Sequence, residues 1–186
     1  MIGNPITIAG IPLPSDAPLF LALIAVHVTA GLTVVIAGAI AMLSRKRSGR
    51  HPQAGTVYYW ALAVVFITMS ALSFFRWNED YHLFILGLMS FVTGTIGRTA
   101  RRKLWPSWLR IHMTGMAMSY ILTITAFYVD NGPNLPVWRE LPPLAFWILP
   151  ALIGAPILIN ALRRHPLVRQ MGGGNRGYSV TSGPDS

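Results

Sequence analysis

Apolar residues gather in five long stretches of this chain, and short polar segments separate them. Each stretch is close to the roughly 20 helical residues that cross the hydrocarbon core of a bilayer. The sequence therefore predicts an all-α integral membrane bundle with five transmembrane helices. The predicted spans cover residues 17–44, 53–76, 79–99, 106–129 and 141–162.

Turn and cap residues support these limits. Ser15 and Asp16 suit the N-cap of the first helix, and Pro52 suits the start of the second. The run of turn residues from Asn131 to Pro136 predicts a rigid loop before the fifth helix. The connection from Arg76 to Tyr81 is hardly more than a turn, so the second and third helices should be antiparallel neighbours.

Basic residues alternate with the predicted spans. Of the 15 Lys and Arg residues, 13 lie in the segments 45–50, 98–110 and 163–176, around the ends of the first, third and fifth spans, and only Arg76 and Arg139 lie near the other gaps. Because short loops rich in Lys and Arg stay in the cytoplasm, the N-terminus should face outward and the C-terminus inward. The predicted order is an outer segment (residues 1–16), the transmembrane domain (17–165) and a cytoplasmic tail (166–186), disordered from about residue 171.

Composition narrows the possible partners. Charged residues make up 11% of the chain and its mean hydropathy is +0.49, whereas a soluble domain has roughly 25% charged residues. The net charge of +9 comes largely from residues that flank the apolar spans. This pattern predicts contact with the anionic headgroups of the cytoplasmic side of a lipid bilayer and argues against nucleic acid. The absence of cysteine excludes disulfides, thiolate ligands and covalently attached haem.

Histidines are the strongest candidates for chemistry. An ionisable side chain inside a membrane is expensive and points to a functional site. His27 lies about ten residues into the first predicted helix, and His112 about six residues into the fourth. Neutral imidazole ligates haem iron and other metals, so His27 and His112 are the candidate ligands of a metal or of haem b, with His51 in support. Counted along the predicted helices, no two of these histidines reach the same depth.

His27 also has a structural interpretation. Its ring would then hydrogen-bond a group on a neighbouring helix, such as the hydroxyl of Thr68, Ser70 or Thr123. For His51 the corresponding interpretation is a cap at the cytoplasmic end of the second helix.

A second polar cluster lies on the predicted outer face, where Arg76, Glu79 and Asp80 precede His82. An interfacial salt-bridge network is one interpretation of this cluster, and an entry site for cations is the other. At the opposite interface, Tyr58 fits a belt of aromatic residues.

Small residues predict close contacts between helices. Gly31 and Gly38 of the first predicted helix are expected to face another helix. The physical reason is that small side chains let helix backbones approach each other in lipid.

Three short motifs follow one another in the predicted helices: His27-x-x-x-Gly31, His51-x-x-x-Gly55-x-x-Tyr58 and Arg110-x-His112. Their order resembles a family of small bacterial multi-pass predicted membrane proteins of unknown function, over most of residues 17–130. That family commonly has arginine where this chain has Pro52. The resemblance implies a multi-pass fold in the bacterial cytoplasmic (inner) membrane. It also marks as shared polar positions His27, His51, Gly55, Tyr58 and His112.

Three functions of different classes remain open. The first is a haem- or metal-binding protein with a redox or electron-transfer role through its intramembrane histidines. The second is a non-catalytic subunit or scaffold, whose partner is another membrane protein or a second copy of the chain. The third is a small transporter or proton relay that uses His27. No HExxH motif or Ser-His-Asp arrangement is present, so hydrolytic chemistry is poorly supported and a non-enzymatic role is favoured.

Overall fold

The computed structural model of this chain describes residues 6–8, 11–13, 17–44, 49–165 and 168. Helices account for most of them: α1 (Pro18–Leu43), α2 (Arg50–Phe75), α3 (Trp77–Lys103), α4 (Trp108–Asn131) and α5 (Pro143–Arg164). Two single-turn 3₁₀ helices, η1 (Gly132–Asn134) and η2 (Trp138–Glu140), connect α4 to α5. Before α1, an antiparallel hairpin joins strands β1 (Ile6–Ile8) and β2 (Ile11–Leu13).

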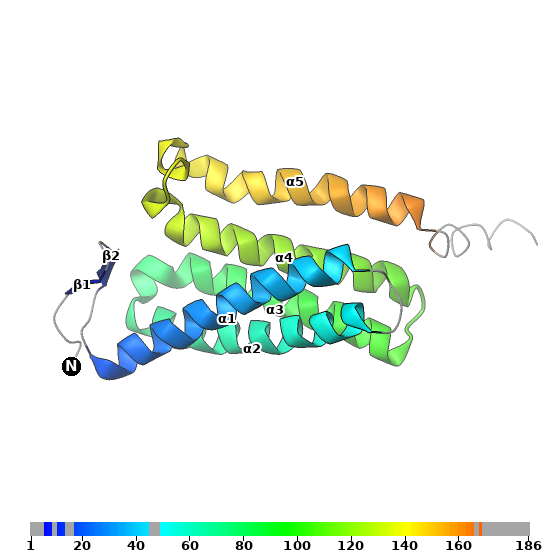
Figure 1. The fold of residues 1–186 in the computed structure, drawn as a ribbon, viewed down its shortest axis with the longest axis horizontal. Coiled ribbons are helices and arrows are strands. Elements are labelled where there is room, and N and C mark those ends of the chain that lie inside the picture. Colours follow the sequence, from blue (N-terminus) through cyan, green and yellow to red (C-terminus); the bar gives the residue numbers. More distant parts are fainter. Residues whose placement is uncertain (1–5, 9–10, 14–16, 45–48, 166–167, 169–186) are drawn as a thin grey trace, which may run out of the picture.

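Consecutive helices run in opposite directions along the long axis of the molecule (Figure 1). In the bundle α1 packs on α2, α2 on α3 and α3 on α4, and α1 also reaches α4. The fifth helix, α5, packs along α4 and lies away from α1 and α2 (Figure 1). The starts of α2 and α4 therefore lie at the same end of the molecule, together with the end of α5.

Charge divides the two ends of the bundle. The end at which α2 and α4 begin is called the basic end, and its described basic residues are Arg50, Arg98, Arg101, Arg102, Lys103, Arg110, Arg163 and Arg164. The opposite end is called the acidic end, and its described charged residues are Arg76, Glu79, Asp80, Asp130, Arg139 and Glu140.

Four helices, α1, α2, α3 and α5, are long and apolar enough to cross a membrane. The remaining helix, α4, is of similar length at 24 residues, is not one of these four, and carries six hydroxyl-bearing side chains. Two of these, Ser119 and Thr125, are buried inside the protein. The described chain is thus an almost entirely helical bundle, as predicted, and its apolar helices indicate a multi-pass membrane protein.

The helix ends differ from the prediction chiefly at the basic end. α2 begins at Arg50, three residues before its predicted start, and α3 continues to Lys103, four residues past its predicted end. Leu104 and Ser107 then take the left-handed conformation, with φ of 50° and 58°. The chain turns there, so α4 begins at Trp108.

The other helix ends lie within two residues of the predicted ones. The hairpin is absent from the prediction, which gives residues 1–16 no regular structure. The predicted tail, residues 166–186, lies outside the described residues except for Val168, and this includes the whole part predicted to be disordered.

Gly38 and Gly31 have different surroundings. A Cβ atom at Gly38 would clash with the ring of Tyr120 and lie 3.2 Å from the ring of Tyr58. Gly38 therefore faces α2 and α4, as predicted. Nothing lies within 4 Å of a Cβ atom at Gly31, so the expectation that Gly31 faces another helix is wrong. The reason is that α1 crosses the bundle at an angle, and its second half approaches α4 (Figure 1).

Candidate functional site

His51 and His112 lie side by side at the basic end of the bundle. Their ring centroids are 6.4 Å apart, and the ring planes cross at 86°. His51 lies in the first turn of α2 and His112 in the second turn of α4. Both side chains are half-buried.

A main-chain carbonyl of a neighbouring helix orients each ring. Nδ1 of His51 donates to the carbonyl of Ala41 in α1 at 2.8 Å, and Nδ1 of His112 donates to the carbonyl of Gly97 in α3 at 3.0 Å. Because a carbonyl oxygen only accepts, the hydrogen of each neutral ring is on Nδ1 and its lone pair is on Nε2. Metal-ligating histidines are commonly oriented in this way, through a hydrogen bond from the other ring nitrogen.

The positions of the helix ends explain why these two rings meet. His51 is one residue after the start of α2, and His112 is four residues after the start of α4. The difference of three residues corresponds to about 4.5 Å along parallel axes. α2 and α4 run in the same direction (Figure 1), so a modest offset brings the rings together. With the predicted starts at residues 53 and 106, the offset is larger.

His27 lies elsewhere in the bundle and is bonded to Thr68. Its Nδ1 is 2.9 Å from Oγ1 of Thr68. The Thr68 hydroxyl is within donating distance of the carbonyls of Val64 and Val65, at 2.8 and 3.1 Å. Its single hydrogen is used there, so the His27 ring is the donor in the bond to Thr68. His27 therefore has the structural role described above, a hydrogen bond to a neighbouring helix, and its partner is the hydroxyl of Thr68.

The structure separates the ligand pair that the sequence favours. Ala41, which orients His51, follows His27 by 14 residues of α1, about 21 Å along the helix. His112 lies beside His51 and is therefore far from His27. His27 and His112 cannot ligate the same metal or haem, and His51 takes the place of His27 as the neighbour of His112.

Tyr58 lies in the protein interior rather than in an interfacial belt, with 2% of its surface exposed. Its hydroxyl is 2.7 Å from Oγ of Ser119. That atom is 3.2 Å from Oγ of Ser90, which in turn lies 2.8 Å from Oγ1 of Thr123. Side chains of α2, α3 and α4 thus form one buried hydroxyl network.

The hydroxyl network and the histidine pair are successive layers of the same helices. Tyr58 follows His51 by seven residues of α2, and Ser119 follows His112 by seven residues of α4. Seven residues are two helical turns, or about 10.5 Å. Sequence reasoning missed this relationship. The signal available to it was the equal spacing on two helices that run in the same direction.

The predicted outer cluster lies at the acidic end. Arg76 and Glu79 form an ion pair three residues apart, and the ring of His82 packs 5.9 Å from the ring of Trp147 in α5. Among the described residues, no three His, Asp or Glu side chains are placed to hold a metal ion. The Arg76–Glu79 pair therefore fits the salt-bridge interpretation, although neither ion pair of the described residues includes Asp80.

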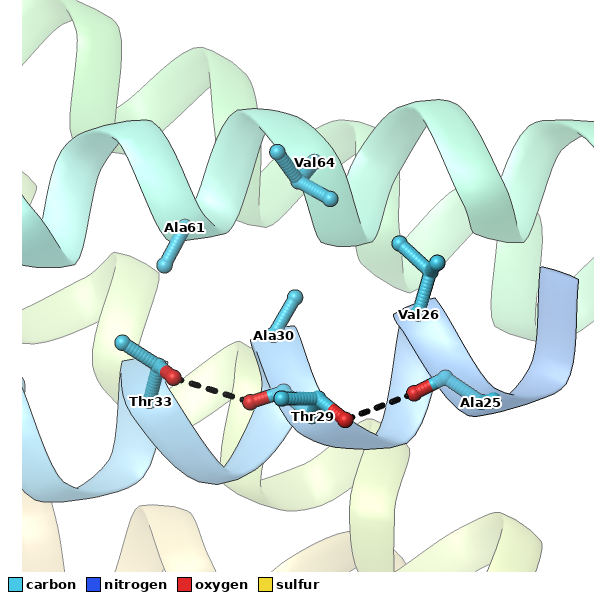
Figure 2. Close-up of a pocket in the computed structure, with 7 residues that line it drawn as sticks. All are labelled: Ala25, Val26, Thr29, Ala30, Thr33, Ala61 and Val64. Carbon is cyan, nitrogen blue, oxygen red and sulfur yellow. Dashed lines mark hydrogen bonds between the residues drawn. The ribbon is translucent and has the colours of Figure 1, made fainter. Parts of the chain in front are cut away.

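A groove of about 460 Å³ lies between α1 and α2 (Figure 2). Its lining consists of Ala25, Val26, Thr29, Ala30, Thr33, Ala61 and Val64. The hydroxyls of Thr29 and Thr33 donate to the carbonyls of Ala25 and Thr29, one turn earlier in α1. Because these hydrogens are used within the helix, the groove presents a mainly apolar surface and suits lipid better than a polar ligand.

His51 and His112 are the two candidate ligands that the structure brings together. In a chain without cysteine, they supply two nitrogen ligands and no thiolate. No family model matches this chain, and neither a curated protein nor a solved structure matches it. The geometry of these side chains is therefore the basis for the proposed function.

Proposed function

We propose that this chain is a five-span protein of the bacterial cytoplasmic membrane, with an outward N-terminus and a cytoplasmic C-terminus. Four of its helices have the length and composition of spans. The starts of α2 and α4 and the ends of α3 and α5 bring their basic residues to one end of the bundle (Figure 1). Lys and Arg at the ends of short loops favour the cytoplasmic side, which supports this orientation.

α4 is proposed as the fifth span because it runs from the basic end to the acidic end between α3 and α5 (Figure 1). Ser119 of α4 is fully buried and bonds side chains of α2 and α3, and 5% of Thr125 is exposed. Hydroxyls that bond to other helices or to their own backbone are compatible with a bilayer core. The buried hydroxyls of α4 therefore support an inner position in the bundle.

Within this bundle, we propose that His51 and His112 would hold one haem b through their Nε2 atoms. The observation that carries the proposal is the pair of imidazoles with centroids 6.4 Å apart, each oriented through Nδ1 by a main-chain carbonyl. Two imidazoles that share a metal through bonds of about 2 Å have centroids roughly 6 Å apart. Haem needs only two ligands from the protein. Among the described residues, no group of three His, Asp or Glu side chains is placed to hold a metal ion on its own.

A bound haem would supply single-electron transfer, and the chain's own residues determine where the ligands lie. The carbonyls of Ala41 and Gly97 fix the plane of each ring and make Nε2 a better electron donor. Four helices position the pair, because α2 and α4 carry the rings and α1 and α3 carry the carbonyls. The proposed redox or electron-transfer role would then lie at the cytoplasmic end of the bundle.

Haem titration of the purified full chain tests this proposal. We expect the Soret band of added haem to shift and to saturate at one haem per chain. His51→Asn and His112→Asn should each abolish the shift, because the asparagine amide can still donate to the carbonyl but has no nitrogen at the position of Nε2. His27→Ala is the matched control and should titrate like the parent. Equal titration of all four proteins would contradict the assignment of the ligands.

A further inference from the structure

A second groove lies on the surface between α3 and α4, at the basic half of the bundle. Its volume is about 350 Å³, and its lining consists of Thr93, Ile96, Arg110, Ile111, Thr114, Gly115 and Met118. The hydroxyl of Thr93 lies 2.8 Å from the carbonyl of Met89, to which it donates. Apart from Arg110, this groove therefore presents mainly apolar surface.

Arg110 gives the groove one charged end. It is the third residue of α4, it is exposed, and its Nη2 donates to the carbonyl of Val168 at 3.0 Å. A guanidinium has five N–H donors in a fixed plane. The bond to Val168 uses part of this set and holds the planar group at the mouth of the groove.

The groove runs inward from this charge. Met118 follows Arg110 by eight residues of α4, about 12 Å toward the middle of the bundle. A membrane phospholipid has the same polarity, since its phosphate lies at the interface and its acyl chains point to the midplane. The charge and the apolar lining of the groove are complementary to those two parts.

We infer that the groove between α3 and α4 binds an anionic phospholipid, with an acyl chain along Ile96, Thr114 and Met118 and the headgroup phosphate at Arg110. The other basic residues of this end favour an anionic headgroup over a zwitterionic one. The inference rests on the proposed membrane orientation and is independent of haem. Its test therefore measures lipid binding, and the result does not depend on whether the chain binds haem.

The test measures the melting temperature of the full chain in nanodiscs of phosphatidylcholine with and without phosphatidylglycerol. A ligand that binds only the folded protein raises its melting temperature. We expect phosphatidylglycerol to produce such a rise in the parent, and we expect Arg110→Gln and Thr114→Phe to lose it. Thr114→Phe keeps every charge and fills the groove, so it decides the question alone if Arg110→Gln does not fold.

Arg102→Gln is the matched control, because it removes the same charge from the same end outside the groove lining. It should keep the rise. Three results would overturn the inference. They are no rise in the melting temperature of the parent, an equal loss of this rise in Arg102→Gln and Arg110→Gln, or a full rise in Thr114→Phe. Inorganic phosphate added to phosphatidylcholine nanodiscs should produce no rise, and an equal rise would show that the acyl chain is not recognised.

Discussion

Gly97 of α3 and Gly115 of α4 bring two helix backbones into direct contact: a Cβ atom at Gly115 would lie 2.9 Å from Cα of Gly97. The same Gly97 accepts the hydrogen bond from His112 through its carbonyl. The crossing point of α3 and α4 is thus also the point at which a candidate ligand is oriented. Helix packing and ring orientation depend on each other here.

Gly115→Ala should destabilise the protein by about 1–3 kcal/mol, the usual effect of overpacking. The new methyl group would lie 2.7 Å from the carbonyl oxygen of Thr93, and neither backbone can move aside cheaply. The measurement is thermal or denaturant unfolding in detergent. Gly31→Ala is the matched control, because its methyl group meets nothing within 4 Å. It should be neutral or stabilising by roughly 0.5–1 kcal/mol, since alanine is the better helix former. Equal losses in both variants would contradict the close crossing.

Tyr58→Phe should lower the free energy of unfolding by roughly 1 kcal/mol, because it removes a hydrogen bond from a buried network. Ser119→Ala removes the other partner of the same bond. In a double-mutant cycle, the two changes should therefore couple by at least about 0.5 kcal/mol. Tyr81→Phe is the control on an exposed tyrosine and should have little effect. Strict additivity of Tyr58→Phe and Ser119→Ala would show that the two hydroxyls do not interact.

Much of the fold could be predicted because the apolar stretches match the helices closely. The hairpin could not, since β1 and β2 are three residues each and β2 contains Pro12, which has no N–H to donate. The surroundings of Gly31 also could not be predicted, because they depend on the angle at which α1 crosses the bundle. A helix-by-helix pattern carries no information on that angle.

The candidate site was predicted only in part. His51, His112 and Tyr58 were all named from the sequence, but their relationships depend on where each helix begins. The left-handed Leu104 and Ser107 set the start of α4, and neither is a residue type that predicts this conformation strongly. An error of a few residues at a helix end is several ångströms of depth, which is enough to pair the wrong histidines.

Reporter fusions test the proposed orientation. A reporter that is active only in the cytoplasm should be active when fused after Leu162, near the end of α5, and inactive when fused after Asn134, in η1. The reason is that basic residues flank the first of these positions and acidic residues lie near the second. The reverse pattern would overturn the orientation, and activity at both positions would remove α5 from the set of spans.

His27→Ala should lower stability by roughly 1 kcal/mol, because its ring bonds Thr68 between α1 and α2. Thr68→Val keeps the shape of the acceptor side chain and removes the same bond. Unfolding measurements should show that the double variant loses less stability than the sum of the losses in the two single variants. Full additivity would indicate that the two side chains act separately. The absorbance of a bound haem should not change in any of these variants.

The absorbance spectrum of the full chain, purified from haem-replete cells, is the most direct test of the proposed function. We expect a Soret band in the parent and in His27→Ala, and its loss in His51→Asn and His112→Asn. Melting curves in parallel would show that the asparagine variants remain folded. A colourless parent, or a band that survives in both folded asparagine variants, would contradict haem binding by the His51 and His112 pair.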